Sequence, residues 1–314
     1  MPIIVKKNEN ISLLRYIKQK LNSEDLIVLP TETVYGLAGL GTSLKAAKKI
    51  YFLKKRPLSK KLIFHCSDLA MVKKFFYIND EIEILSKKFW PGPLTFILKA
   101  KSKKIPKNLT IKGECAVRVP NNKFTQKVIK HLNKPLVMPS ANRYKQISPV
   151  TPQMVFDQFI GTQLIIIDDG HCKIGIESTI LKLDNSNVSI LRNGQITKKH
   201  ILKLMPYLNF NHNLTNLSFP GSDKKHYSPN KKLFLNIKNK KKLSAFINFG
   251  KNKIGQFKNL SERNSLKEAA RNLYHYIYLA DINKKFKTIS IAPIPNEGIG
   301  IAINDRLKRA SSKI

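Results

Sequence analysis

The sequence contains few cysteines and few acidic residues, and it has no long apolar run. Its three cysteines, Cys66, Cys115 and Cys172, are scattered, and no C-x-x-C pair or other zinc spacing occurs. Neither a disulfide framework nor a structural zinc site is therefore predicted. The apolar runs are too short to span a bilayer, and residues 1–10 lack the apolar core of a signal peptide. We expect a cytoplasmic protein with no membrane partner.

Several motifs that carry enzyme chemistry are also missing. The chain has no nucleophile elbow, no H-E-x-x-H, no pair of metal-ligating histidines and no phosphate-loop or dinucleotide-binding glycine pattern. The polar candidates that remain are mainly cations and hydroxyls. Such groups suit the binding of phosphates and a carboxylate, with catalysis by positioning and charge stabilisation.

Acidic residues are outnumbered by basic ones, 20 against 57, which gives a formal net charge of +37. One interpretation is a nucleic-acid partner, because basic proteins bind phosphate backbones without sequence specificity. The other is a lysine-rich composition, since lysines are spread along the whole chain and specific sites usually concentrate arginine. We favour the second interpretation, and we still expect weak RNA binding at low salt.

The length of 314 residues allows two domains. Residues 1–205 alternate strand-like and helix-like periodicity, which predicts an α/β domain. Residues 206–232 have linker composition, although a histidine and an aromatic residue at 226–227 suggest a docking or lid element. Residues 233–314 return to strand–helix–strand–helix order, which predicts a small α/β domain with parallel strands.

The chain is organised around the segment from Leu29 to Arg56. A strand over 26–29 ends at Pro30, and a polar, glycine-rich turn from Thr31 to Gly41 is expected to follow. A helix then begins near Thr42 or Ser43, and its last turn is basic. Backbone N–H groups and cations at such a junction suit an anionic ligand.

Polar side chains recur where predicted strands end, and in open sheets such ends line ligand sites. These residues are Thr33, His65, Arg118, Ser140, Asn142, Ser178 and Arg192. Taken singly, His65 fits a core histidine, and Ser140 and Asn142 fit turn caps. Arg118 is more specific, because a guanidinium inside an apolar strand needs an anion or a carboxylate as its partner.

Several short motifs, in their order and spacing, resemble the YrdC/Sua5 family. In the first 205 residues they are PTETVYGL (30–37), KKRP (54–57), LIFH (62–65), WPGPLT (90–95), AVRVP (116–120), PSAN (139–142), ESTI (177–180) and LRNG (191–194). HYSP (226–229) and GIAINDRL (300–307) resemble the longer, two-domain branch. The resemblance implies a YrdC-like twisted mixed sheet with flanking helices, plus a small Rossmann-like C-terminal domain joined by a linker.

The resemblance also implies an activity, the synthesis of L-threonylcarbamoyladenylate and pyrophosphate from L-threonine, bicarbonate and ATP. ATP would be a substrate, with Mg²⁺ bridging its phosphates and no dedicated protein cage needed to hold that ion. The adenylate would pass to a tRNA threonylcarbamoyl transferase that forms t6A at position 37 of tRNA.

At the positions of this sequence that match the family motifs, the resemblance implies specific roles for the side chains. The residues expected to hold threonine are Thr33, His65, Arg118, Met138 through its backbone, and Ser178. Those expected to contact ATP are Arg56, Lys60, Ser140, Asn142, Ser148, Arg192 and Tyr227, with Tyr227 acting as a lid. We expect the catalytic cations to be Arg56, Lys60 and Arg118, and we name no metal ligand. The chain departs from the family pattern at Glu114, Lys61 and Arg143–Tyr144.

The alternative from another functional class is a non-catalytic protein that binds double-stranded RNA or tRNA in a basic groove. Thr33, His65 and Ser178 argue against it, because such a groove needs no amino-acid pocket. A carbamoyl-transfer role like that of hydrogenase-maturation proteins is disfavoured, because the chain lacks their cysteine-rich zinc motifs and their acylphosphatase segment.

Overall fold

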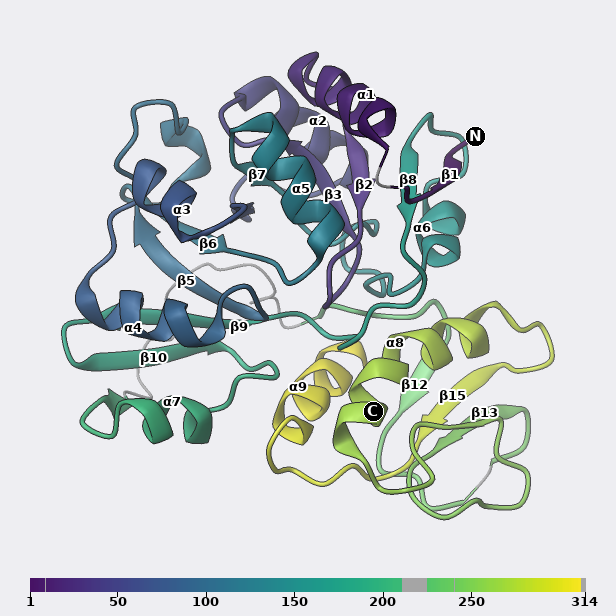
Figure 1. The fold of residues 1–314 in the computed structure, drawn as a ribbon. Coiled ribbons are helices and arrows are strands. Elements are labelled where there is room, and N and C mark those ends of the chain that lie inside the picture. The colour runs from purple at the N-terminus through teal and green to yellow at the C-terminus, as the bar shows by residue number, and fades with distance from the viewer. Residues whose placement is uncertain (9, 211–224, 240, 312–314) are drawn as a thin grey trace.

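The structure is a computed structural model that describes residues 1–8, 10–210, 225–239 and 241–311, and these form two β-sheets with surrounding helices (Figure 1). In spatial order the larger sheet contains β1 (Ile3–Lys6), β8 (Ile165–Asp168), β2 (Ile27–Leu29), β3 (Gly36–Leu40), β7 (Leu136–Val137), β4 (Ile63–His65), β6 (Glu114–Arg118), β5 (Leu94–Lys99), β9 (Thr179–Asp184), β10 (Asn187–Arg192) and β11 (Asn209–Phe210). Parallel and antiparallel neighbours both occur, so the predicted mixed sheet is confirmed.

Helices cover this sheet and carry the connections between its strands. They are α1 (Ile11–Asn22), α2 (Leu44–Lys54), α3 (Leu69–Phe75), α4 (Asp80–Phe89), α5 (Lys123–Leu132), α6 (Pro152–Gln158) and α7 (Lys198–Leu204), with a 3₁₀ turn at Lys107–Leu109. Helix α1 packs on α5 and against β2 and β3, whereas α6 packs on β1 and β8. The core lies between these helices and the sheet.

The C-terminal domain contains a parallel sheet in the order β12 (Lys232–Phe234), β15 (Thr288–Ile291), β13 (Ser244–Asn248) and β14 (Lys258–Asn259). Helices α8 (Leu266–Ile282) and α9 (Gly300–Ala310) complete it. The strands are parallel, as the strand–helix order predicted, and the connection from β14 to β15 runs through α8. The predicted domain boundaries stay predictions, and most of the predicted linker, residues 211–224, lies outside the described residues.

Helix starts follow the capping residues that the sequence offers. The side chains of Ser43, Asp68, Thr151 and Ser265 each accept a hydrogen bond from a backbone N–H in the first turn of their helix. Ser265 and Glu268 have the spacing of a capping box at the start of α8, but this box forms only in part. The Glu268 carboxylate accepts from the Ser261 hydroxyl at 2.6 Å, and the Ser261 hydroxyl in turn accepts from the Ser265 N–H at 2.9 Å.

The expected glycine-rich turn before α2 is wrong in one respect, because Gly36–Leu40 is the buried strand β3. It pairs antiparallel with both β2 and β7. Gly36 is required for packing, since a Cβ there would lie 2.4 Å from Met138 Cγ. The polar turn is therefore the β2–β3 hairpin loop over 30–35, and the start of α2 lies at the other end of β3. The C-terminal end of α2, with its cations, is the end that reaches the site.

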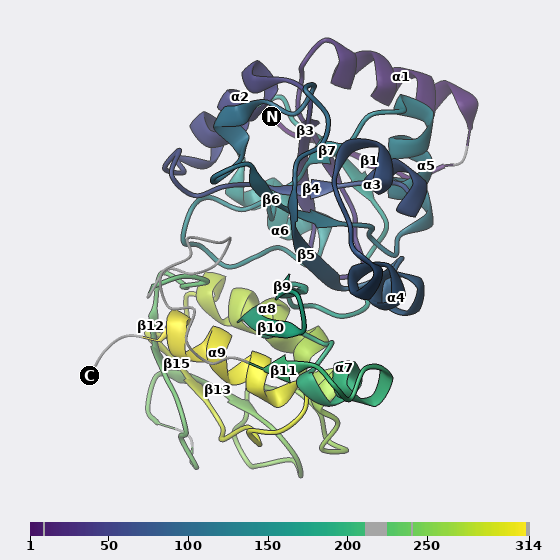
Figure 2. The ribbon, with the colours of Figure 1, turned by 90° about the vertical axis from the view of Figure 1, so that its left-hand side faces the viewer.

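The two domains pack against each other through α8 and α9, which Figures 1 and 2 show between the C-terminal sheet and the rest of the molecule. Gly175 approaches α8 so closely that a Cβ would lie 2.5 Å from Arg271 Cα. About two turns further along α8, the Tyr278 hydroxyl donates to the Asp157 carboxylate on α6. The C-terminal domain is thus held directly on the larger domain.

Candidate active site

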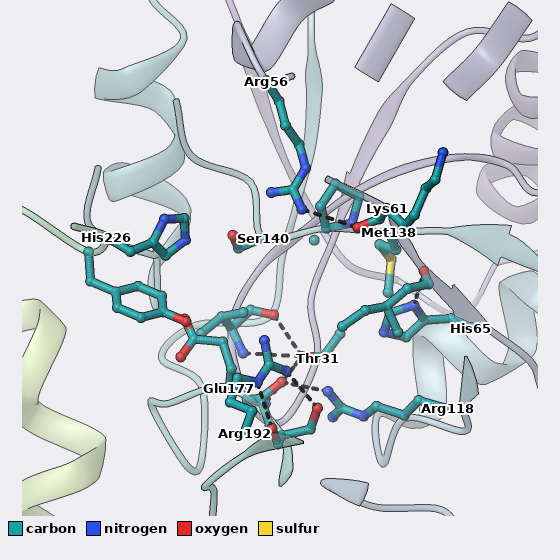
Figure 3. Close-up of a pocket in the computed structure, with 17 residues that line it drawn as sticks. Thr31, Arg56, Lys61, His65, Arg118, Met138, Ser140, Glu177, Arg192 and His226 are labelled. Atoms are coloured by element: carbon teal, nitrogen blue, oxygen red, sulfur yellow. Dashed lines mark hydrogen bonds between the residues drawn. The ribbon is translucent and has the colours of Figure 1, made fainter. Parts of the chain in front are cut away.

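A cavity of about 50 Å³ lies where the β2–β3 loop, the ends of β4, β6 and β10, the loop after β7 and the 226–227 segment meet (Figure 3). All five residues expected to hold threonine line it: Thr33, His65, Arg118, Met138 and Ser178. Of the residues expected to contact ATP, it is lined by Arg56, Ser140, Arg192 and Tyr227. Residues separated by almost two hundred positions are thus brought to one pocket.

Three predicted ATP contacts do not line this cavity, namely Lys60, Asn142 and Ser148. The Asn142 side chain fixes the 139–146 loop, since its oxygen accepts from the Ser140 hydroxyl at 2.5 Å and its nitrogen donates to Gln146 O at 2.9 Å. The buried Ser148 hydroxyl lies beside the Glu177 carboxylate. The roles expected of these three residues in binding ATP stay predictions.

Arg118 ends β6 in register with His65 on β4 and Thr95 on β5. Its Nη1 donates to Thr33 Oγ1 at 3.0 Å and its Nε donates to Gly92 O at 3.1 Å. Its Nη2 lies 2.5 Å from the buried carboxylate of Glu32, an ion pair that the sequence analysis missed. The anion that Arg118 was expected to need is therefore supplied by the protein, and N–H groups of the same fork border the cavity.

The hairpin loop holds the hydroxyl of Thr33 in one direction. The Thr31 hydroxyl donates to Val34 O at 2.6 Å, so the 2.8 Å bond between Thr31 and Thr33 uses the hydrogen of Thr33. Thr33 Oγ1 accepts in turn from Arg118. This oxygen is therefore presented to the cavity as an acceptor.

His65 is buried and neutral. Burial and the nearby Arg118 guanidinium lower the pKa of His65 to about 3. Its Nδ1 lies 3.2 Å from Ile63 O, and a carbonyl oxygen can only accept, so Nδ1 carries the proton. Nε2 is consequently a hydrogen-bond acceptor, one suited to an amine or hydroxyl of a ligand.

Ser178 is positioned from two sides. Arg192 donates through Nε to Ser178 O at 2.9 Å and through Nη2 to Ser178 Oγ at 3.0 Å, while Thr95 Oγ1 lies 2.8 Å from the same hydroxyl. Gly194 permits this approach, since a Cβ there would lie 2.4 Å from Thr179 N. The 192–194 turn therefore fixes both a cation and a hydroxyl at one wall of the pocket.

Lys54 is a site residue that the sequence analysis did not select. It is buried at the end of α2, and its ammonium donates to Ser140 O and Asn142 O at 2.5 Å each. Burial, Arg56 and Arg143 lower its pKa well below the usual range. A signal was available, because Lys54 stands four residues after Ile50 and seven after Ala47, on the buried face of the helix.

Arg56 comes directly after the end of α2. The preceding residue, Lys55, adopts a left-handed conformation (φ 52°) that ends the helix and turns the chain. The Arg56 guanidinium donates to Lys60 O at 2.9 Å and to Lys61 O at 3.1 Å. Lys61 lines the cavity, but Figure 3 shows its amine pointing away, and that amine bonds Asn108 O at 2.8 Å. Of these neighbours, Arg56 is the one whose cation faces the pocket.

At Glu114 the chain departs from the family pattern, and the negative charge of this residue is compensated by a neighbouring lysine. Its carboxylate accepts from the Lys182 ammonium at 2.7 and 2.9 Å. Glu114 begins β6 whereas Arg118 ends it, so the ion pair lies at the other end of the strand from the site. Glu114 therefore does not line the described pocket.

The pocket also contains the Glu177 carboxylate, to which the sequence analysis gave no role, and the histidine that it placed in a docking or lid element at 226–227. The Glu177 carboxylate accepts from Arg306 Nε and from the Tyr274 hydroxyl, each at 3.0 Å, and both donors belong to the C-terminal domain. Burial raises the pKa of Glu177, but Arg306 and Arg192 outweigh it and hold this pKa below the ordinary value. His226 lines the pocket beside Tyr227.

Two family models match the chain and together span nearly its whole length. The Sua5/YciO/YrdC model, described as "Telomere recombination", matches residues 19–194. A second, described as "Threonylcarbamoyl-AMP synthase, C-terminal domain", matches residues 196–312. The chain belongs to the Sua5/YciO/YrdC family. The resemblance inferred from the motifs is thereby confirmed.

Two curated relatives that align over nearly the whole chain have the same name. The threonylcarbamoyl-AMP synthase of Pyrococcus abyssi is 29% identical, over 99% of this chain and 98% of its own length. The threonylcarbamoyl-AMP synthase of Bacillus subtilis is also 29% identical, over 93% of this chain and 90% of its own. The chain therefore spans the length of both relatives.

Solved structures with a similar fold lead to the same family. The crystal structure of P. abyssi Sua5 complexed with L-threonine covers 99% of this chain and 97% of its own, with a TM-score of 0.88 at 27% identity. A full-length HypF structure covers 57% of this chain and 28% of its own, with a TM-score of 0.51 at 16% identity, and shares the fold alone. The two-domain architecture is therefore that of Sua5.

Within the residues that the structure describes, two kinds of feature were not found. No three His, Cys, Asp or Glu side chains gather in a way that could hold a metal ion. No helix in the same residues is long and apolar enough to cross a membrane.

Proposed function

We propose that the chain is a threonylcarbamoyl-AMP synthase that converts L-threonine, bicarbonate and ATP into L-threonylcarbamoyl-AMP and pyrophosphate. The observation that carries this proposal is that all five predicted threonine-binding residues line one cavity. Two findings support it: the relatives aligned over their whole length bear this name, and the similar Sua5 structure was solved with L-threonine.

Threonine would be held by groups of opposite character. The Arg118 fork, already fixed by Thr33, Gly92 and Glu32, would donate to the substrate carboxylate. His65 Nε2 would accept from the amine or the hydroxyl of the substrate. Ser178 and the backbone of Met138 would complete the polar contacts.

ATP would be bound by two cations that line the cavity. Arg56 and Arg192 would contact phosphate oxygens together with Ser140, and Lys60, Asn142 and Ser148 are proposed as further contacts. The Lys54 ammonium would act through the loop, since it fixes Ser140 and Asn142. A backbone and side chains held in this way need little reorganisation when charge develops.

The chemistry is one of positioning. The threonine amine would react with bicarbonate to give a carbamate with loss of water, and a carbamate oxygen would attack the α-phosphorus of ATP, displacing pyrophosphate. Arg56, Arg192 and Lys60 would stabilise the negative charge that builds on the phosphorus oxygens and on the leaving group. Neutral His65 would not protonate the carbamate at ordinary pH, because its pKa is lowered to about 3.

The residues of this site could accommodate a magnesium ion that arrives bound to ATP. The described pocket offers no set of open carboxylates, since Glu177 is held by Arg306 and Tyr274, and Glu32 by Arg118. A magnesium ion would therefore be held mainly by the phosphates of ATP and by water, and it would supply charge neutralisation there. The downstream partner would be a tRNA threonylcarbamoyl transferase that consumes the adenylate.

The linker would act as a lid. Tyr227 is buried and lines the cavity from the 225–232 segment. The cavity of about 50 Å³ is smaller than the ~300 Å³ or more typical of pockets for drug-sized ligands, and outward movement of this segment would enlarge it to admit ATP. Closure would then exclude water from the carbamate. Tyr227→Ala should lower the rate of adenylate formation, and full activity in that variant would refute the lid.

The deciding experiment measures pyrophosphate release from ATP with and without L-threonine and bicarbonate, in the wild type and in Arg56→Ala. Release that requires both co-substrates and collapses in the variant supports the synthase. Release without threonine would indicate a different adenylating activity. No release under any condition would favour the RNA-binding alternative. Weak RNA binding at low salt, expected from the net charge of +37, stays a prediction.

A further inference from the structure

A buried ion pair joins the C-terminal domain to the wall of the active site. Arg306, on α9, is fully buried, and its Nε donates to Glu177 Oε2 at 3.0 Å although 129 residues separate them. Its Nη1 contacts Asp305 Oδ2 at 3.0 Å. Glu177 itself lines the cavity. A charge of the second domain is therefore placed directly behind the pocket.

Aromatic rings complete this contact. The guanidinium carbon of Arg306 lies 5.6 Å from the centroid of the Tyr227 ring, and the Tyr227 and Tyr274 rings are 5.7 Å apart. The Tyr274 hydroxyl donates to the same Glu177 oxygen at 3.0 Å. Arg306 thus touches both the carboxylate of the wall and the aromatic residue of the linker. We call Arg306, Tyr274, Glu177 and Tyr227 the interdomain cluster.

The backbone of residues 226–228 is fixed at the same place. The His226 N–H donates to Arg309 O at the end of α9 at 3.1 Å, and the Ser228 N–H donates to Lys145 O of the larger domain at 2.8 Å. Between them Tyr227 has φ 60°, a left-handed conformation that is unfavourable for a tyrosine. Such a conformation persists only where surrounding contacts determine it. The backbone bonds to Arg309 and Lys145 do so here, together with the packing of the Tyr227 ring on Arg306 and Tyr274.

The position of the cluster sets its effect on the pocket. Figure 3 shows His226 on the side of the cavity near Ser140, away from His65 and Arg118. Loss of Arg306 would leave the Glu177 carboxylate buried without its main cation, beside the proposed phosphate-binding groups. It would also remove the surface on which Tyr227 packs. Both consequences act on residues proposed to contact the nucleotide, Arg192 beside Glu177 and Tyr227 beside Arg306.

We propose that Arg306 is a positioning residue for the nucleotide: through Glu177 and Tyr227 it holds the linker over the ATP side of the pocket. This inference rests on the proposed function and deepens it, because it gives the C-terminal domain a role in ATP binding. Arg306 contacts neither of the proposed substrates and acts through its two partners. The domain is accordingly part of the active site.

The test compares Arg306→Gln with Arg309→Gln in the full chain. Arg309 is a matched control, because it stands one turn later on α9 and bonds Asp305 at 2.9 Å, whereas its backbone carries the bond to His226. Hydrogen–deuterium exchange at the amides of His226 and Ser228 reports linker closure without turnover. The KM values for ATP and for threonine, measured by pyrophosphate release, show which of the two substrates the substitution affects.

For Arg306→Gln we expect exchange at these amides to accelerate about tenfold and the KM for ATP to rise about tenfold, as for loss of a hydrogen bond to a charged group. The KM for threonine should change much less, and Arg309→Gln should resemble the wild type. Arg306→Lys, which retains the charge, should recover part of the affinity for ATP. Unchanged exchange in Arg306→Gln, or equal effects in the two glutamine variants, would overturn the proposal.

Tyr274→Phe keeps the test decisive if Arg306→Gln does not fold. It removes only the hydroxyl that donates to Glu177, so it should cause a smaller change in exchange and in the KM for ATP, in the same direction. No change there would overturn the proposal. The two proposals fail separately: absence of threonine-dependent pyrophosphate release in the wild type refutes the synthase, whereas exchange at the linker amides still decides the role of Arg306.

Discussion

The Glu32 carboxylate and the Arg118 guanidinium form a buried ion pair, with Oε1 and Nη2 2.5 Å apart, at the proposed threonine carboxylate site. Both side chains are only 4% exposed, so neither charge is compensated by water. Removing one partner of such a pair leaves the other charge buried and uncompensated. The pair therefore holds Arg118 ready for a second carboxylate.

Glu32→Gln should destabilise the protein by about 3 kcal/mol, because the Arg118 cation loses its partner. The carboxylate of L-threonine would then supply part of the missing negative charge. We therefore expect L-threonine to raise the melting temperature more in Glu32→Gln than in the wild type, measured by thermal unfolding. L-Threonine amide, which lacks the carboxylate, serves as the control ligand. Equal shifts in the two proteins would show that Arg118 is not the carboxylate site.

The lowered pKa of His65 predicts how stability depends on pH. The pKa is about 3 in the folded protein and about 6.5 in the unfolded chain, so between these values the unfolded state binds a proton that the folded state does not. The contribution of His65 is complete above pH ~6.5 and is lost as the pH falls, by up to about 1.4 kcal/mol per pH unit.

Urea unfolding at several pH values between 4 and 7 measures this slope. His65→Gln should show a shallower loss of unfolding free energy on acidification than the wild type, whereas His131→Gln, at an exposed position on α5, should keep the wild-type slope. An unaltered slope in His65→Gln would mean that another group controls the acid response.

Ser178→Ala tests the wall that Arg192 builds. The variant removes a hydroxyl bonded to Arg192 and Thr95, so we expect the KM for threonine to rise about tenfold while the fold is retained. Ser189→Ala, at another buried serine of the same hairpin, is the control. Pyrophosphate release at varied threonine concentration provides the measurement, and a KM within twofold of the wild type would exclude Ser178 from the threonine site.

Lys54→Met tests whether the lysine beneath the 139–142 loop matters for ATP. Methionine keeps an apolar stem of similar size but cannot donate to Ser140 O and Asn142 O. We expect the KM for ATP to rise about tenfold or more, because two charge-assisted bonds are lost. Lys55→Met, at the next position and exposed, should have little effect. Similar kinetics in the two variants would contradict the role assigned to Lys54.

The sequence predicted most strands and helices, because their apolar periodicity and caps are local signals. It did not predict β3, since Gly36, Gly39 and Gly41 suggested a turn. In the fold these glycines are needed for close packing, and a Cβ at Gly41 would lie 2.7 Å from Pro135 O. Composition alone does not distinguish a glycine that permits a turn from one that permits contact between strands.

The sequence predicted which residues belong to the candidate site more fully than it predicted the contacts between their side chains. Arg118 was correctly expected to need an anion, but Glu32 stands 86 positions before it, and nothing in the local pattern links the two. The same holds for Lys54, whose partners are 86 and 88 residues away. Such pairings depend on the sheet order, in which β3, β7, β4 and β6 become neighbours.

The contact between Arg306 and Glu177 has a consequence for how the active enzyme is made. Glu177 precedes the second sheet in the chain and Arg306 lies on its last described helix, so the cluster can form only after both domains have been synthesised. Contacts of such high sequence separation form late and slow the final steps of folding. We therefore expect a newly made chain to acquire ATP affinity last, after its threonine pocket has assembled.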